Sequence, residues 1–400
     1  MAPSLALLLF TFLGFISLGL PDAITGVVWP SASLEFGVPL GNLGFILVSF
    51  TSGYLAASFS IVSLIRRLGV GGLLTVSCTV VVASLAGFGF APSFGWYVAS
   101  AFFAGLGAGA IDTGLNAFAS RHFSAKHMSW LHACWAVGAT TGAAIAAFVL
   151  AEGFSWRWTY AVIAAALIPI TMTFTLVRRI WEETSEEMRS TQTPSAPLTQ
   201  ALKHPVVWLQ AFIFFVYVGA ESTIGQWSYT LLTKYRDVAE TSAGWSVTLY
   251  WTSLTLGRFL LGSIADRISP RLLLTTAIST SFVGGLLFVL SPSPTLAACG
   301  LVVLGLSLAP IYPGMMSQTP ARLAHLSEAA IGFQIAIGLL GQVFVPSLGG
   351  ILIESLGLGA LNLLPAFLLA VLWVAFIVLF WSPWTRLSKR VAITEAPASF

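Results

Sequence analysis

Apolar residues fill this chain in long blocks separated by short polar interruptions. A helix needs about 20 predominantly apolar residues to cross the hydrocarbon core of a bilayer. Reading the sequence for runs of that length predicts twelve membrane helices. Their approximate ranges are 5–30, 41–64, 70–91, 94–118, 129–150, 157–177, 206–232, 243–264, 271–291, 295–317, 329–353 and 358–381.

One interruption is much longer than the others and divides the chain into two halves. It runs from 179 to 204, is rich in glutamate and in turn-forming residues, and therefore predicts a linker. The predicted fold is an all-α membrane protein with two pseudo-symmetric six-helix bundles. The predicted parts are an N-terminal bundle at 1–178, a cytoplasmic linker at 179–204, a C-terminal bundle at 205–383 and a cytoplasmic tail at 384–400.

Composition supports a membrane protein and offers no sign of an enzyme. Apolar residues make up 57% of the chain and charged residues 8%, whereas soluble domains carry about 25% charged residues. The sequence contains no P-loop, no His-Glu-x-x-His and no glycine-rich dinucleotide turn. Cys78, Cys134 and Cys299 are far apart and have no metal-ligand spacing. We therefore expect no enzymatic activity, no cofactor and no bound metal.

Lysine and arginine predict the orientation of the helices. Basic residues concentrate in the cytoplasmic loops of membrane proteins. If the N-terminus is cytoplasmic, fourteen of the 18 basic residues fall on the cytoplasmic side, and Arg157, Lys234 and Arg236 fall outside. Both termini should therefore be cytoplasmic. The fourteen are Arg66, Arg67, Arg121, Lys126, Arg178, Arg179, Arg189, Lys203, Arg267, Arg271, Arg322, Arg386, Lys389 and Arg390.

The two halves repeat one another at an offset of about 200 residues. Asp22 corresponds to Glu221, and Arg67 corresponds to Arg267. A duplicated six-helix unit with sites between its halves is typical of carriers that work by alternating access. Further pairs at this offset are Gly26 and Gly225, Gly105 and Gly305, Ile111 and Ile311, Gly114 and Gly314, Ala136 and Ala336, and Gly138 and Gly338.

Three carboxylates lie inside predicted membrane helices: Asp22, Asp112 and Glu221. An ionised Asp at the centre of a membrane helix costs roughly 2.5–3.5 kcal/mol on insertion scales, so such residues usually have a function. A carboxyl group in low-dielectric surroundings can exchange a proton near neutral pH. We therefore predict proton coupling by these three residues.

Each carboxylate also has an alternative interpretation. Asp112 and Asn116 are four residues apart and share a helix face. They could be a protonatable carboxyl beside a solute-binding amide, or they could form a structural hydrogen bond between helices. Asp22 follows Pro21 and could instead reach the outer membrane interface. Glu221 could bind solute, relay a proton or pair with Arg258.

The loop after the eighth predicted helix carries a motif that resembles the major facilitator superfamily. The matching residues are Gly257-Arg258, Gly262, Ala265-Asp266-Arg267 and Arg271. The resemblance extends over the whole chain, and it implies that Arg258, Asp266, Arg267 and Arg271 form a gate. The corresponding first-half loop departs from the pattern, because Arg66 stands where an Asp is expected.

Within that superfamily, several segments are similar to the fucose:proton symporter branch. They are Gly109-Ala-Ile-Asp-Thr-Gly-Leu-Asn116, Trp130-Leu-His-Ala-Cys-Trp135, Gly219-Ala-Glu-Ser-Thr-Ile-Gly-Gln-Trp227, Ala309-Pro-Ile-Tyr-Pro313 and Gly332-Phe-Gln334. The resemblance implies acidic residues for proton coupling and sugar binding in the first and fourth helices, where Asp22 and Asp112 stand.

Polar and aromatic residues near these carboxylates are candidates for solute binding. An imidazole can change charge near neutral pH, and an indole can stack on the apolar face of a sugar. The alternatives to solute binding are structural: a histidine at the membrane interface, a residue of the aromatic belt, or packing in the core. The candidates are Asn116, His132, Trp135, Trp227, Tyr312 and Gln334, with Gln342 as a weaker one.

These patterns predict a monomeric secondary transporter of the cell inner membrane that couples proton entry to uptake of a small polar solute, a sugar by resemblance. The nearest alternative is a proton-antiport exporter of drugs or other hydrophobic compounds. A second alternative is a membrane receptor that keeps the transporter fold without transport. The direction of solute and proton movement separates the first two, and binding without flux would indicate the third.

Overall fold

The computed structural model describes residues 5–123, 125–181, 198–264, 267–323 and 326–381. Within these ranges the regular structure is helical, and ten helical stretches are long and apolar enough to cross a membrane. Counting both arms of the kinked second stretch and adding the less apolar α10 (Glu240–Ile264) gives the twelve passes that the sequence predicts. The linker segment 182–197, Asp266 and the tail beyond 381 lie outside the described residues.

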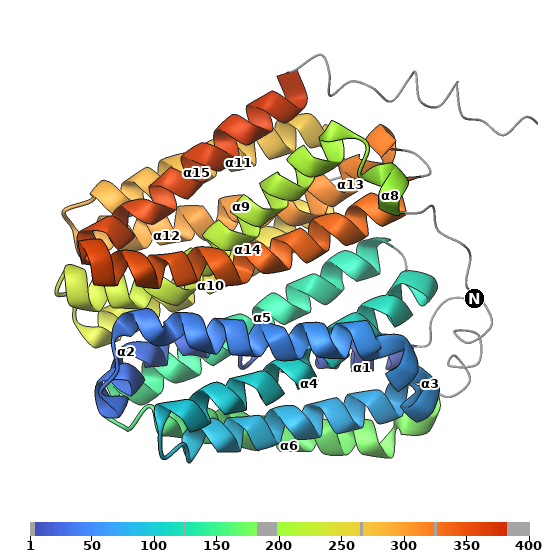
Figure 1. The fold of residues 1–400 in the computed structure, drawn as a ribbon, viewed down its shortest axis with the longest axis horizontal. Helices are drawn as coiled ribbons and strands as arrows, with labels where there is room; N and C mark the ends of the chain where they lie inside the picture. The colour runs from blue at the N-terminus through green and yellow to red at the C-terminus, as the bar shows by residue number, and fades with distance from the viewer. Residues whose placement is uncertain (1–4, 124, 182–197, 265–266, 324–325, 382–400) are drawn as a thin grey trace, which may run out of the picture.

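The helices form two bundles that lie side by side (Figure 1). The first bundle holds α1 (Leu5–Gly19), α2 (Ile24–Phe36), η1 (Leu40–Asn42), α3 (Leu43–Gly89), α4 (Phe94–His122), α5 (Ala125–Ala151), α6 (Arg157–Leu176) and η2 (Arg178–Trp181). The second holds α8 (Leu198–Ala201), α9 (Pro205–Thr230), η3 (Leu231–Tyr235), α10, α11 (Pro270–Leu290), α12 (Pro294–Leu308), α13 (Ile311–Leu323), α14 (Ser327–Leu356) and α15 (Leu358–Trp381).

Three predicted helix boundaries differ from the structure, each for a local reason. The first span is not one helix, because α1 ends at Gly19 and α2 starts at Ile24, with Pro21 and Asp22 in the break. The tenth span is likewise split at Ala309-Pro310. The second and third spans merge into α3, which turns at Gly69, where φ is 66°. Only glycine adopts that backbone conformation at low cost.

Glycines bring neighbouring helices into backbone contact within each bundle. A Cβ atom at Gly138 of α5 would lie 2.3 Å from the carbonyl oxygen of Ile16 in α1, and one at Gly109 of α4 would lie 2.4 Å from that of Tyr54 in α3. Small residues at helix interfaces are the usual means of close packing inside a membrane. These contacts place the break at Asp22 beside α5, and Tyr54 beside α4.

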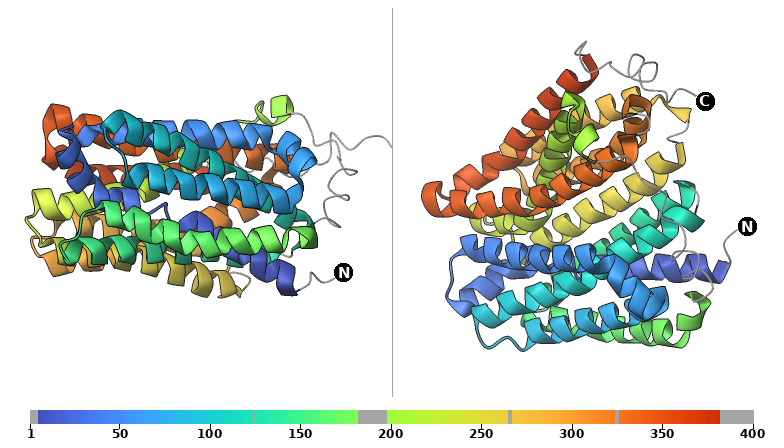
Figure 2. Two further views of the ribbon diagram at one scale, coloured as in Figure 1. Left: turned by 90° about the horizontal axis from the view of Figure 1, so that it is seen from below. Right: turned by 45° about the vertical axis from the view of Figure 1, so that its right-hand side comes forward.

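The two bundles touch at one end and diverge at the other (Figure 2). We call the diverging end the basic end, because it carries Arg66, Arg67, Arg178, Lys203, Arg267 and Arg271. At the opposite end the halves meet along a closed seam. A Cβ atom added to a glycine in this seam would clash with atoms of the other half. The seam contacts are Gly26 with Gln226, Gly41 with Gly350, Gly44 with Ser347, and Gly244 with Ala147.

Candidate functional site

A cavity of about 1060 Å³ lies between the two halves. Its lining comes from α1, α2 and the break between them, from α3, α4, α5 and α6, and from α9, α10, α11, α13 and α14. The lining reaches Ile268 and Pro270, beside exposed Arg267 at the basic end. Small-molecule sites usually measure about 300–1000 Å³, so the volume includes room for a solute and a path to it. The charged lining residues are Asp22, Asp112, Glu221 and Arg258.

Asp112 projects into the cavity from the middle of α4. The Tyr54 hydroxyl of α3 donates a hydrogen bond to Asp112 Oδ2, and Asn116 Nδ2 donates one to Asp112 Oδ1 over 3.0 Å. Asn116 also binds the Asp112 carbonyl oxygen over 3.0 Å, and it does not line the cavity. Asp112 has no ion-pair partner among the described residues. Neutral donors therefore surround a carboxyl that faces the cavity.

Asp22 reaches the same cavity from the break between α1 and α2. The break, rather than a continuous helix face, sets its position, because its backbone N–H bonds to the Gly19 carbonyl oxygen over 3.1 Å. The side chain of Trp135 on α5 lies within hydrogen-bonding reach of the Asp22 carboxyl. Like Asp112, Asp22 has no cationic partner among the described residues.

Glu221 differs from the two aspartates because it has a cationic partner. Arg258 Nη2 of α10 lies 3.3 Å from Glu221 Oε1, and the two side chains are 11% and 13% exposed. The Tyr217 hydroxyl donates to Glu221 Oε2, and the Tyr250 hydroxyl donates to the Glu221 carbonyl oxygen over 3.3 Å. The pairing of Glu221 with Arg258, one of the alternatives from sequence, is therefore present.

Arg258 also touches the first half of the molecule. Its guanidinium carbon lies 4.9 Å from the centre of the Trp135 ring, within the range of a cation–π contact. Its Nη1 lies 3.5 Å from the carbonyl oxygen of His132. The sequence motif assigned Arg258 to a gate, and its side chain lies in the cavity wall, where it contacts both halves.

The remaining predicted residues fall into two groups. His132, Trp135 and Tyr312 line the cavity, as does the weaker candidate Gln342. Trp227 and Gln334 do not line it, because they are buried in the second bundle. Trp227 Nε1 donates to the Pro346 carbonyl oxygen over 2.9 Å, and Gln334 bonds to Gln210 and Thr319 over 3.2 Å each.

Two of the predicted gate residues, Arg267 and Arg271, do not line the cavity. Arg267 and Arg271 are exposed at the basic end. The Arg271 guanidinium lies 4.5 Å from the centre of the Trp381 ring. Asp266 lies outside the described residues, so the proposed brace between Asp266 and these arginines stays a prediction.

Sequence reasoning missed many residues of the cavity wall, among them Tyr54, Gln226 and Trp251. Tyr54 contacts Asp112 across a helix interface, and no spacing along the chain indicates such a partner. Gln226 and Trp251 lie next to Gly225, where a Cβ atom would come within 2.7 Å of Trp251 Cζ2. The repeat pair Gly26 and Gly225 indicated that helices approach closely at these glycines, but it did not identify Trp251 as the residue whose ring packs against Gly225.

Comparison with known families identifies the class of protein. A model of the Major Facilitator Superfamily matches residues 11–237 and 228–400, which cover nearly the whole chain. The chain therefore belongs to the Major Facilitator Superfamily, a class of multi-pass membrane transporters rather than enzymes. This confirms the resemblance that the motif from Gly257 to Arg271 indicated.

Several curated relatives are sugar transporters, at low identity. The chain is 22% identical to Bypass of stop codon protein 6 of Saccharomyces cerevisiae, over 94% of this chain and 81% of that protein. It is 23% identical to the Sodium-dependent glucose transporter 1 of Homo sapiens, over 84% of this chain and 72% of that protein. A glucose/mannose transporter of Bacillus subtilis is 22% identical over 86% of each chain.

Solved structures show the same fold. A nucleoside transporter superposes with a TM-score of 0.72 at 12% identity, covering 93% of this chain and 98% of that one. The Escherichia coli fucose:proton symporter superposes with a TM-score of 0.60 at 14% identity, with the same coverage. These identities are low, so the likeness supports the fold and not a substrate.

Proposed function

We propose that this protein carries a sugar or a similar small polar solute together with protons, in the same direction, by alternating access. The observation that carries the proposal is the contrast among the cavity carboxyls. Asp22 and Asp112 face the cavity with neutral partners, whereas Glu221 is held by Arg258. A carboxyl without a compensating cation is costly to keep ionised in a closed, water-poor site. Protonation removes that cost.

The cycle follows from this charge balance. With both aspartates ionised, the cavity wall carries three negative charges and one positive charge, and closing it is unfavourable. Proton uptake by Asp22 and Asp112 neutralises the uncompensated pair, so the loaded cavity can close. Glu221 remains paired with Arg258 throughout the cycle. The names of the relatives from Homo sapiens and Bacillus subtilis favour a sugar as the solute.

The orientation of the helices in the membrane indicates the side toward which the cavity opens. By the positive-inside rule, the basic end faces the cytoplasm of a cell whose inner membrane holds the protein. The cavity reaches that end and the closed seam lies opposite, so this is the inward-facing state of the cycle. Rocking of the two halves about α5 and α10 would open the seam and expose the same carboxyls to the outside.

Transport measured in proteoliposomes tests the proposal. A pH gradient, acidic outside, should drive uptake of D-glucose, D-galactose, D-mannose or L-fucose, and a sodium gradient alone should not. Asp112→Asn should abolish sugar-driven proton movement and keep sugar exchange, whereas the exposed control Glu152→Gln should behave like the wild type. Undiminished coupling in Asp112→Asn would remove Asp112 from the mechanism. Movement of solute and protons in opposite directions would indicate an exporter. Uptake driven by a sodium gradient would show that sodium, and not the proton, is the coupling ion. Binding without flux would indicate a receptor.

A further inference from the structure

Two residues of the cavity wall carry buried polar atoms that lack hydrogen-bond partners within the described parts of the chain. They are Oε1 of Gln226 on α9 and Nε1 of Trp251 on α10. Trp251 is 6% exposed. Buried polar groups are nearly always hydrogen-bonded in native proteins, so an exception in the wall of a cavity needs an explanation, and a functional role is one of them.

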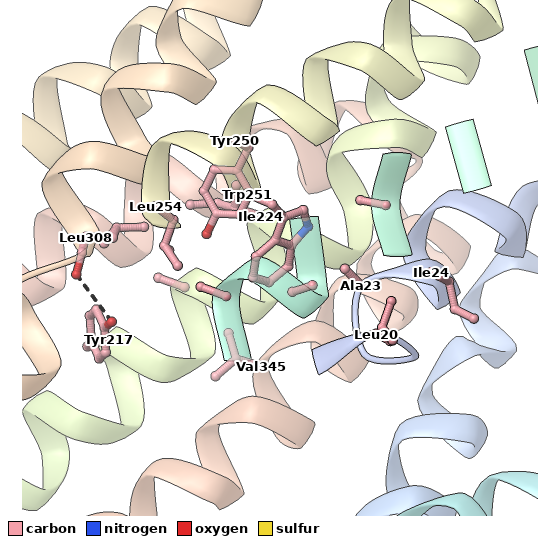
Figure 3. Close-up of a cluster of buried hydrophobic side chains, with 14 of the residues drawn as sticks. Leu20, Ala23, Ile24, Tyr217, Ile224, Tyr250, Trp251, Leu254, Leu308 and Val345 are labelled. Carbon is pink, nitrogen blue, oxygen red and sulfur yellow. Dashed lines mark hydrogen bonds between the residues drawn. The ribbon is translucent and has the colours of Figure 1, made fainter. Parts of the chain in front are cut away.

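Both residues lie at the closed end of the cavity, on α9 and on the part of α10 that packs against it. Gly225 lets the Trp251 ring lie directly against α9, because a Cβ atom there would come within 2.7 Å of Cζ2. Gly26 of the first half approaches Gln226 so closely that a Cβ atom would lie 2.7 Å from its Cα. Figure 3 shows the Trp251 indole between Ile224 and Tyr250 of its own half and Ala23 of the other.

Both halves of the molecule hold the Trp251 ring in place. Its ring centre lies 5.8 Å from that of Trp135 on α5, with the planes at 78°. The Tyr250 ring packs against it at 5.2 Å. Seven residues before Ile224 on α9, the Tyr217 hydroxyl bonds to the Leu308 carbonyl oxygen over 3.3 Å (Figure 3). A ring fixed by such packing presents its N–H in one direction, which suits recognition of a defined group.

We infer that Gln226 and Trp251 form a hydroxyl-recognition subsite for a neutral polyhydroxylated ring, an inference that rests on the proposed function. One atom is an acceptor and the other a donor. Hydroxyl groups both donate and accept hydrogen bonds, so a ring that carries several of them can satisfy both atoms. An ammonium group only donates and an ionised carboxylate only accepts, so each leaves one of the two atoms unpaired. The subsite therefore selects hydroxyl-bearing solutes over simple cations and anions.

Solute derivatives that lack single hydroxyls test the subsite. Among D-glucose, D-galactose, D-mannose and L-fucose, the sugar transported best by the wild type is compared with its monodeoxy derivatives. One derivative should show a KM about tenfold higher than the parent, the size expected for one lost hydrogen bond to a buried partner. Trp251→Phe should raise KM for the parent sugar by about the same factor and leave KM for that derivative unchanged.

Controls separate recognition from structure. Gln226→Met keeps the length of the side chain without the acceptor and should single out one hydroxyl of the ring in the same way, even if Trp251→Phe folds poorly. Trp158→Phe, on the exposed face of α6, should not change KM. If Trp251→Phe and Gln226→Met raised KM equally for the parent sugar and for every derivative, the inference of a hydroxyl-recognition subsite would be overturned. Preferred transport of an amine or a carboxylate would overturn both proposals, whereas intact hydroxyl selection without proton movement would overturn proton coupling alone.

Discussion

Arg258 and Glu221 form an ion pair in the wall of the central cavity, with Nη2 and Oε1 3.3 Å apart. The same guanidinium contacts the Trp135 ring at 4.9 Å, so one cation joins the charge of the second half to an aromatic residue of the first. The pair leaves the aspartates of the first half as the uncompensated acids of the cavity. Its consequences can be tested one residue at a time.

Neutralising one partner of this ion pair should destabilise the protein more than neutralising both. Glu221→Gln or Arg258→Gln leaves a mostly buried charge without its partner, which typically costs about 3–5 kcal/mol. The double variant Glu221→Gln/Arg258→Gln should recover most of that loss. Thermal unfolding in detergent measures the effect. The double variant should also keep proton coupling, and its loss there would mean that Glu221 carries a proton.

Closure of the seam should depend on the missing side chain of Gly26. In Gly26→Ala the new Cβ would lie 2.7 Å from Gln226 Cα and from the Gly225 carbonyl oxygen, and backbone atoms cannot move aside cheaply. We expect the variant to favour the state in which the seam is open and the basic end is closed. The measurement is labelling of Ser347→Cys by a membrane-impermeant maleimide, in a background without the three native cysteines.

Gly332→Ala is the matched control for the seam. Gly332 is helical and exposed on α14, and apart from its own helix turn no described residue has an atom within 4 Å of the position of its Cβ. Labelling of Ser347→Cys should rise several-fold with Gly26→Ala and stay at the wild-type level with Gly332→Ala. Equal labelling in both would show that the seam tolerates an added methyl group.

Two glutamines of α14 should respond differently to the same substitution. Gln334 is fully buried in a closed triangle with Gln210 and Thr319, whereas Gln342 lines the cavity. Gln334→Leu leaves the other two members short of partners and should cost about 1–3 kcal/mol of stability without changing KM. Gln342→Leu should change KM with little effect on thermal stability. The reverse outcome would place the solute within the second bundle.

The sequence predicted the architecture well because a bilayer restricts what a long apolar run can be. It also predicted the contact between Asp112 and Asn116, since four residues along an unbroken helix bring two side chains onto one face. Asp22 did not follow that rule. Pro21 interrupts the helix, and the break positions the carboxyl instead.

Other parts of the site could not be predicted from one sequence. The apolar faces of a membrane helix toward lipid, toward a neighbouring helix and toward a cavity have similar compositions. Trp227 and Trp251 are both aromatic residues beside glycine-containing segments, yet the first is core and the second lines the cavity. The partnership of Tyr54 with Asp112 depends on how α3 packs on α4, which no local pattern specifies.

In each half, an arginine near the seam binds carbonyl oxygens at the end of a helix, but the two arginines come from different elements. Arg157 binds the carbonyl oxygens of Gly89 and Ala91 at the end of α3, over 2.8 and 2.9 Å. Arg236 binds the Val289 carbonyl oxygen at the corresponding end of α11 over 3.1 Å. The 200-residue offset relates Gly89 to Val289, but it does not relate the two arginines, which come from α6 and from the segment after α9.

Arg157 also pairs with Glu35, and the two contributions can be separated. Arg157→Ala removes the donor to both carbonyl groups and should lower stability by about 1–3 kcal/mol. Glu35→Gln removes the charge and one of the two acceptor oxygens, which bond Trp156 Nε1 and Arg157, from a side chain that is 46% exposed, so solvent should keep its effect below about 1 kcal/mol. Thermal unfolding in detergent at low and high salt compares them. A loss in Glu35→Gln as large as that in Arg157→Ala, and reduced by salt, would show that charge and not carbonyl binding holds this corner of the first half together.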